Sequence, residues 1–457
     1  MSSTVQSAPW IQGIRTYTDP RGWLWLLTLD LYPAMVAFVL PWSTSAVSVM
    51  IVLWLGALLP TIRPRAFVAS LKRPESLLPL MFFALAVAGM LWADESWSVR
   101  LLGLHPVAKL LVIPMLLYHF GRSRRSHWVF IAFFVSCALL MGFSWAIYFA
   151  PGLKFAATEN AGVPVKNYID QSQELALCLF AAAPLLVTLL EARRWGAALG
   201  WAVLLLGFLC NMMFVVVART AFVYMPVLLV LFAVRYFRPK AAIGFLVAAV
   251  AVVVLLGLAS PYVRYRVQWI AHDYNLRAHS DVATSDGERM AYWRTSIRSI
   301  EKAPVFGHGT GSTKQLFDEE AAGKTGEWAN VIRNPHNQTL YVAVQWGILG
   351  CIVLYAMWYF HLALFFGRSF AAWIGLVVVV QNFVSSLVNS HLFDFHEGWI
   401  YVLGVGVAGG MVAAARREQQ DALTRAAPAA ACSTKSHGRV GTGAVALPSG
   451  IEPLSPP

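Results

Sequence analysis

The sequence predicts an all-α polytopic membrane protein with about twelve transmembrane helices and a helical periplasmic domain between spans 9 and 10. Of its 457 residues, 58% are hydrophobic and only 13% are charged, and the mean hydropathy is +0.60. Because so few charges could not cover a water-facing surface, a soluble domain is excluded. The apolar runs are continuous and about 18 to 22 residues long, which suits helices; a transmembrane β-barrel would need short alternating segments.

The predicted spans follow from length and hydropathy alone. In chain order they are Trp23–Trp42, Ser45–Pro60, Ser76–Ala93, Leu101–Phe120, Trp128–Ala150, Glu174–Leu190, Gly196–Val217, Ala221–Phe237, Ala241–Ser260, Thr339–Phe360, Phe370–Val388 and Trp399–Ala415.

Basic residues mark every second short loop. These loops carry, in order, Arg63, Arg65, Lys72 and Arg73; Arg122, Arg124 and Arg125; Arg193 and Arg194; Arg235, Arg238 and Lys240; Arg368; and Arg416 and Arg417. The alternate short loops, such as residues 94–98 and 389–398, contain no Lys or Arg. The positive-inside rule therefore predicts that both termini are cytoplasmic, which agrees with an even number of spans.

The spans divide the chain into five predicted regions. They are a cytoplasmic leader (1–22), spans 1–9 (23–260), a periplasmic loop expected to be the functional domain (261–338), spans 10–12 (339–417) and a cytoplasmic tail (418–457). The tail is rich in Ala, Gly, Pro and Ser and is expected to be disordered. The periplasmic loop is expected to contain an interfacial helix that starts near Asp286, followed by a break at Pro304 and a flexible turn over residues 307–311.

The formal net charge of +12 does not point to nucleic acid, because the cytoplasmic loops and the tail account for most of it. Topogenesis does not explain the arginines expected at or beyond the outer membrane surface. These are Arg219, Arg264, Arg266, Arg277, Arg289, Arg294 and Arg298. Their position suggests an anionic ligand on that side of the membrane.

Arg219 lies where two hydrophobic spans meet with almost no loop between them. Burying its guanidinium costs several kcal/mol unless the group is paired or lines a wet cavity. It either extends to the phospholipid headgroups or binds phosphate oxygens in a bidentate manner. Arg289 has two similar interpretations, as part of the solvated face of an interfacial helix or as a phosphate ligand.

His336 belongs to the run Asn334-Pro335-His336-Asn337 directly before the span that begins at Thr339. Histidine is the side chain whose unperturbed pKa suits a general base near neutral pH. The alternative is that His336 only caps the following helix, a role that Asn337 or Asn334 would fill equally well.

The order of these motifs resembles the bacterial O-antigen ligase family. An Arg-Thr pair ends one span (Arg219), and a long external loop contains Arg-x-x-x-Trp (Arg289 to Trp293) and Gly-x-Gly (Gly307, Gly309). His-Asn (His336, Asn337) then precedes Trp-Gly-x-x-Gly at Trp346, Gly347 and Gly350. The resemblance covers roughly residues 23–417.

The resemblance implies a glycosyltransferase reaction at the periplasmic face of the bacterial inner membrane. A ligase of this kind transfers a polysaccharide from undecaprenyl diphosphate to a sugar hydroxyl of lipid A-core, and no cofactor or metal is implied. His336 is then the expected general base, and Arg219 and Arg289 neutralise the departing diphosphate. Arg264, Arg266, Asn337 and Trp293 are expected to bind the substrates.

Several alternatives stay open at this point. O-antigen polymerases and protein O-oligosaccharyltransferases share the donor-side motifs, so Arg219, Arg289 and His336 do not separate them from a ligase. A transporter of lipid-linked glycans would also use many spans, although no internal repeat is visible, and a non-enzymatic scaffold would leave the external arginines unexplained. Separately, residues 391–397 offer two His and two carboxylates as ligands for a divalent ion.

Overall fold

A computed structural model describes residues 20–154, 158, 161–216, 218–261, 264–265, 268, 285–323 and 334–436. Of residues 20–21, 285–288 and 425–436 only the backbone is described. The chain divides into two compact units, residues 1–412 and 413–457. The features below lie in the first unit unless stated otherwise.

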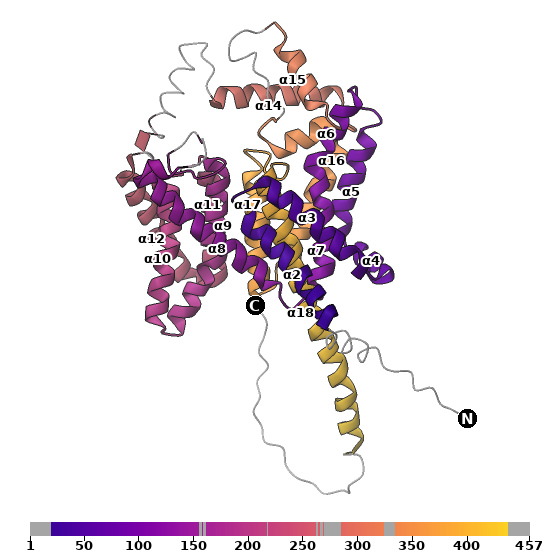
Figure 1. Ribbon diagram of the computed structural model, residues 1–457, viewed down its shortest axis with the longest axis vertical. Helices are drawn as coiled ribbons and strands as arrows, with labels where there is room; N and C mark the ends of the chain where they lie inside the picture. The colour runs from indigo at the N-terminus through magenta and orange to yellow at the C-terminus, as the bar shows by residue number, and fades with distance from the viewer. Residues whose placement is uncertain are drawn as a thin grey trace, which may run out of the picture. The chain divides into compact units, whose positions relative to one another are not determined.

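The described residues form helices and connecting segments, and they contain no strand (Figure 1). The α-helices are α2 (Pro20–Val39), α3 (Thr44–Leu58), α4 (Pro64–Leu71), α5 (Pro74–Gly89), α6 (Trp97–Ala108), α7 (Val112–Phe120), α8 (His127–Phe149), α9 (Tyr168–Glu191), α10 (Trp195–Phe214), α11 (Ala221–Tyr236), α12 (Pro239–Ala259), α14 (Ser285–Lys302), α15 (Thr313–Ala321), α16 (Gln338–Leu364), α17 (Phe370–Ser385) and α18 (Phe395–Ser436). Short 3₁₀ turns are η1 (Leu59–Thr61), η2 (Lys109–Leu111) and η3 (Pro151–Leu153).

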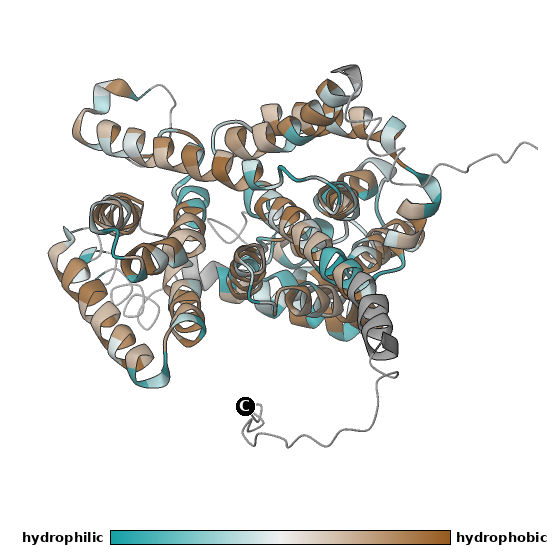
Figure 2. Ribbon diagram, turned by 90° about the horizontal axis from the view of Figure 1, so that it is seen from below, coloured by the Kyte–Doolittle hydropathy of each residue, from teal (hydrophilic) through white to brown (hydrophobic). Residues whose placement is uncertain are grey.

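The predicted membrane character is confirmed. In the described part of the chain, nine helical segments are long and apolar enough to cross a membrane, and α5, α11 and α17 are shorter apolar helices at three further predicted spans. Hydrophobic residues predominate along the helices (Figure 2), and α12 buries only 6% of its most apolar window within the protein. The protein is therefore a multi-pass helical membrane protein, while the count of twelve spans and their orientation stay predictions.

Helix starts follow local rules of capping. The side chains of Ser43, Asn167, Asn337 and Ser369 accept hydrogen bonds from the first turns of α3, α9, α16 and α17. Proline occupies the first turn of α4, α5 and α12, where its missing N–H leaves no helical hydrogen bond unmade.

The helix α9 begins six positions earlier than the predicted span, which started at Glu174. Its first two turns are polar, yet residues 170–174, Asp-Gln-Ser-Gln-Glu, are all buried. Hydropathy assigned them to a loop because nothing local shows that other helices cover them. This extension carries polar side chains into the interior of the bundle.

The predicted interfacial helix is present as α14, and α14 and α15 lie beyond one end of the bundle formed by α5, α6 and α16 (Figure 1). The periplasmic location of this region stays a prediction. The last helix, α18, continues past Arg417 to Ser436, beyond the start of the predicted tail, and the boundary between the two units falls within it. Residues 437–457 lie outside the described part, so the predicted division into domains stays untested.

The turn at residues 303–311 docks into a break in α16. The break is at Gly347, which has φ 60° and ψ −152°. Carbonyls of Val344 and Gln345 accept from the backbone N–H groups of His308 (2.9 Å) and Gly309 (2.8 Å), and Ile348 N donates to Pro304 O at 2.9 Å. The docked turn thus satisfies the backbone groups that the interrupted helix would leave unpaired.

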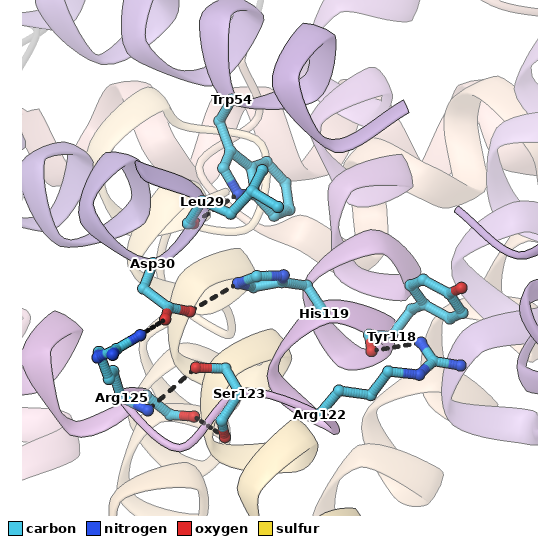
Figure 3. A network of polar contacts seen from close by, with 9 residues as sticks. Leu29, Asp30, Trp54, Tyr118, His119, Arg122, Ser123 and Arg125 are labelled. Atoms are coloured by element: carbon cyan, nitrogen blue, oxygen red, sulfur yellow. Dashed lines mark hydrogen bonds and ion pairs between the residues drawn. The ribbon is translucent and has the colours of Figure 1, made fainter. Parts of the chain in front are cut away.

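A buried ion cluster joins α2 to the connection between α7 and α8 (Figure 3). Asp30 Oδ2 accepts from Arg125 Nη1 at 3.3 Å, and Asp30 Oδ1 lies 3.0 Å from His119 Nε2. The His119 ring packs edge-on against Trp54, whose Nε1 donates to Leu29 O at 3.1 Å. Arg125, which the sequence indicated only as a topogenic charge, therefore also anchors the first described helix.

We predict that Gly347→Ala loosens the docked turn. An alanine Cβ at this position would lie 2.3 Å from Val305 O, and its backbone conformation costs a non-glycine residue about 1 to 3 kcal/mol. Trypsin should cleave the variant faster after Lys302 and Lys314. The control is Gly142→Ala in α8, where a Cβ meets nothing within 4 Å; equal cleavage rates in the two variants would contradict the prediction.

We also predict that Asp30→Ala lowers the thermal stability of the detergent-solubilised protein. Removing one partner of a buried ion pair typically costs about 3 kcal/mol or more, because the remaining charge stays desolvated. The exposed Asp94→Ala is the matched control and should change stability by about 0.5 kcal/mol at most. If both variants melt together, the cluster does not stabilise α2.

Candidate functional site

His336 lies in the turn directly before α16. It adopts a positive φ of 52°, which is uncommon for a residue other than glycine, and Asn334 Oδ1 accepts from His336 N at 2.9 Å. The helix cap is Asn337, whose Oδ1 accepts from Leu340 N at 3.0 Å and whose Nδ2 donates to Leu387 O at 2.9 Å. Because Asn337 caps the helix, the His336 imidazole is available for another role.

The imidazole of His336 is oriented by Asn389, in the connection between α17 and α18. His336 Nδ1 lies 2.8 Å from Asn389 Oδ1, which also accepts from the backbone N–H of Ser390 at 3.0 Å. The Ser390 N–H identifies this atom as the amide oxygen. Because an amide oxygen can only accept hydrogen bonds, His336 Nδ1 must donate its N–H to it. The other nitrogen, Nε2, has no hydrogen-bond partner among the described residues.

The surroundings of His336 lower its pKa. Burial has the largest effect, the hydrogen bond to Asn389 opposes it, and the positive charge of Arg289 on α14 lowers the pKa further. The imidazole is therefore neutral near pH 7, with an unprotonated nitrogen. Arg289 and His336, separated by 47 positions in the sequence, are close enough in the fold to interact electrostatically.

A buried polar layer lies behind His336. Asn389 Nδ2 donates to His391 Nε2 at 2.9 Å, and Gln173 Nε2 of α9 lies 3.0 Å from His391 Nδ1. Gln381 of α17 donates to Gln173 Oε1 at 2.6 Å. Burial lowers the pKa of His391 to about 3, so this ring is neutral too.

The two histidines of residues 391–397 face different partners. His391 contacts Gln173 and Asn389, whereas His396 Nδ1 pairs with Asp170 of α9 at 2.6 Å. Lys109, in the turn between α6 and α7, donates to the backbone oxygens of Phe393 and Asp394. Across the described residues, no three or more His, Cys, Asp or Glu side chains are arranged to hold a metal ion.

Arg219 lies in the turn between α10 and α11 and is half-buried. One turn into α11, the Tyr224 hydroxyl lies 3.5 Å from Ser172 Oγ in the polar first turns of α9. The start of α11 therefore reaches the same buried layer that contains Gln173, next to Ser172 in the sequence.

The predicted substrate-binding residues have different surroundings. Asn337 is engaged as the helix cap, and Trp293 is half-buried, with an Nε1 that has no hydrogen-bond partner among the described residues. Arg264 is exposed, and Arg266 lies outside the described residues. Their predicted roles stay predictions.

Two clefts lie among the described helices. An apolar cleft of about 630 Å³ is lined by α9, α10, α11 and α12, and its lining includes Ala218 and Ala221 on either side of Arg219. A more polar cleft of about 650 Å³ lies between α6, α15 and α16, with Tyr341 and Gln345 on its wall. One space suits an acyl or prenyl chain and the other a hydroxylated molecule.

Sequence reasoning missed Asn389, Gln173 and Gln381. The sequence signal that could have found Gln381 is the presence of polar residues inside an apolar run, because Gln381 and Asn382 interrupt an otherwise apolar α17. Polar residues at such positions are costly in a membrane and frequently functional. Their partners, however, come from distant parts of the chain.

The fold and the site together define a multi-pass membrane protein with a neutral histidine, nearby arginine and a buried polar layer. Residues 202–355 match the model of the family described as O-antigen ligase. The match confirms the resemblance found in the sequence, and it contains Arg219, Arg289 and His336. The match supports a relationship to the superfamily of O-antigen ligases and polymerases, whose members are membrane glycosyltransferase-like enzymes. No curated protein matches the chain.

We predict that the pH dependence of His336 modification by diethyl pyrocarbonate, followed by peptide mass spectrometry, reveals its lowered pKa. The reagent attacks an unprotonated imidazole nitrogen, so the midpoint should be lower in the folded protein than in the denatured one, where histidine titrates near about 6.5. Arg289→Gln removes a nearby positive charge and should move the midpoint upward. The exposed Arg298→Gln on the same helix should not; identical midpoints in folded and denatured protein would contradict the prediction.

Proposed function

We propose that the protein is an O-antigen ligase, which transfers a polysaccharide from undecaprenyl diphosphate to a sugar hydroxyl of lipid A-core at the periplasmic face of the inner membrane. The observation that carries the proposal is the unprotonated Nε2 of His336, held at the start of α16 by Asn389 within the family-matched segment. Both substrates are lipid-linked, which suits a site at the end of a membrane-spanning helix.

His336 acts as the general base. The acceptor hydroxyl oxygen attacks the anomeric carbon of the donor sugar while its proton moves to His336 Nε2. The bond between that carbon and the diphosphate oxygen breaks, and undecaprenyl diphosphate leaves with the electron pair. Because the pKa of His336 is lowered, the base is unprotonated and ready at neutral pH.

Arg219 and Arg289 neutralise the diphosphate. A diphosphate is a weakly basic leaving group and needs stabilisation of its growing negative charge more than it needs a proton. Guanidinium groups bind phosphate oxygens in a planar, bidentate geometry. The proximity of Arg289 to His336 supports this role, because the donor's anomeric carbon and its first phosphate must both lie near the base.

The apolar cleft supports a prenyl-linked donor. Ala218 and Ala221, which line it, flank Arg219 in the sequence, so a diphosphate bound by Arg219 has an apolar space of about 630 Å³ beside it. A water-soluble nucleotide sugar would leave this surface unused.

The remaining substrate-binding residues are proposed without separating contacts to the donor from contacts to the acceptor. Trp293 Nε1 is a buried donor without a partner in the described structure, and it would donate a hydrogen bond to a sugar or phosphate oxygen. Arg264 and Arg266 are assigned to phosphates of the donor or acceptor, and Asn337 holds the turn that carries His336 as well as facing the substrate.

The test is a transfer assay with purified protein, undecaprenyl-diphosphate-linked glycan and lipid A-core in the presence of EDTA. Wild type should give a mobility-shifted lipid product. His336→Ala should lose about 10²- to 10⁴-fold in rate, the usual contribution of a general base. Arg219→Lys should lose at least about tenfold, because lysine cannot form the bidentate contact.

Arg298→Lys is the matched control, because this arginine is exposed and paired with Glu320. Full turnover by His336→Ala would refute the base assignment, and full turnover by Arg219→Lys would refute the clamp. Chain growth with the lipid-linked donor alone, without transfer to lipid A-core, would identify a polymerase instead.

A further inference from the structure

We infer that Asn389 is a positioning residue that selects the tautomer of His336, so that Nε2 and not Nδ1 is the nitrogen that accepts the proton. This inference rests on the proposed function. It assigns a role to a residue outside the family-matched segment, which ends at residue 355.

The orientation of the Asn389 amide follows from its contacts. Its Oδ1 faces two groups, the backbone N–H of Ser390 at 3.0 Å and His336 Nδ1 at 2.8 Å, while its Nδ2 lies 2.9 Å from His391 Nε2. The Ser390 N–H can only donate, so a flipped amide would set two donors against each other. A neutral His336 therefore carries its proton on Nδ1.

The amide has little freedom to move. Asn389 is 6% exposed and His391 is completely buried. The Asn389 backbone oxygen accepts from Gln338 N at 3.1 Å, and the same N–H donates to Ser386 O at 2.9 Å. These bonds join the connection between α17 and α18 to the start of α16.

The turn that carries His336 is fixed from the same connection. Ser390 Oγ donates to Asn334 Oδ1 at 2.7 Å, and Asn334 Oδ1 accepts from the His336 backbone N–H. This contact holds the uncommon positive φ of His336, a conformation that persists only when its surroundings enforce it. Both the backbone and the ring of His336 thus depend on residues 389–390.

A neutral imidazole has two tautomers, and only one exposes a lone pair on Nε2. Without an acceptor at Nδ1, part of the population would carry the proton on Nε2 and could not act as the base. A buried amide achieves the selection without adding a charge, whereas a carboxylate would also raise the pKa of the ring. The choice of asparagine thus keeps the base neutral beside a diphosphate site.

The charged and titratable groups around His336 set the background for a test. Arg289 approaches from α14, and His391 lies behind Asn389 in the same connection. Asp170 on α9 acts on His391. A substitution at Asn389 leaves Arg289 and Asp170 in place, but it also changes the hydrogen-bond partner of His391 Nε2.

The first measurement does not depend on turnover. Asn389→Asp keeps an oxygen at Nδ1 but adds a negative charge, so the midpoint for modification of His336 by diethyl pyrocarbonate should rise by about one pH unit or more. Asn382→Ala is the control, because this buried amide on α17 has no side-chain partner among the described residues. An unchanged midpoint in folded Asn389→Asp protein would overturn the inference.

The second measurement is the pH profile of transfer. Asn389→Ala should lower kcat by about 10- to 100-fold, as the loss of an orienting partner of a functional histidine does, with little change in the donor KM. Asn389→Asp should be active at high pH. As the pH is lowered, it should lose activity at a higher pH than wild type does, in parallel with its modification midpoint. An equal loss at every pH in Asn389→Asp would indicate only a structural role and would overturn the inference.

The two proposals fail in different ways. If the midpoint rises in Asn389→Asp but His336→Ala keeps full transfer activity, the hydrogen bond is confirmed and the ligase mechanism is refuted. Should Asn389→Ala not fold, as judged by size-exclusion chromatography, Asn389→Asp still decides the question because it preserves the acceptor oxygen.

Discussion

The interior of this bundle depends on one constraint, which is that a buried polar group without a hydrogen-bond partner costs free energy. The first turns of α9 bring five consecutive polar residues into the interior, and their partners come from several helices. Gln171 contacts α8 and α10, Ser172 contacts α11, and Gln173 contacts α17 and the connection to α18. This polar layer connects helices that are distant in the sequence. His336 occupies its edge, where the layer changes from fully buried to half-buried.

The chemistry proposed for the site follows from the same layer. A histidine beside an arginine would normally be a poor arrangement for binding a proton, since the positive charge lowers its pKa. In the proposed reaction this arrangement is useful, because the imidazole must be unprotonated before the substrate arrives. Binding of a diphosphate between Arg219 and Arg289 would cancel much of that positive charge and thereby raise the proton affinity of His336 when a proton has to be taken up.

Much of the fold was accessible from the sequence, because hydropathy locates apolar helices whatever they contact. His336 and Arg289 were also accessible, since their motifs are local and ordered along the chain. Asn389 and Gln173 were not, because their importance arises from contacts between positions 53 and 218 residues apart. The early start of α9 was missed for the same reason, as a polar helix turn resembles a loop until other helices are seen to cover it. The proposal of His336 as the base therefore came from the sequence, and the inferred tautomer came from the structure.

The docked turn at residues 303–311 links α14 to α16. The first turns of α16 exchange hydrogen bonds with this turn at the point where the helix is interrupted, and the turn is covalently continuous with α14. The helix that carries Arg289 and the helix whose start carries His336 are therefore tied together by backbone hydrogen bonds at the break in α16. The distance between Arg289 and His336 thus depends on this turn as well as on the packing of the surrounding helices.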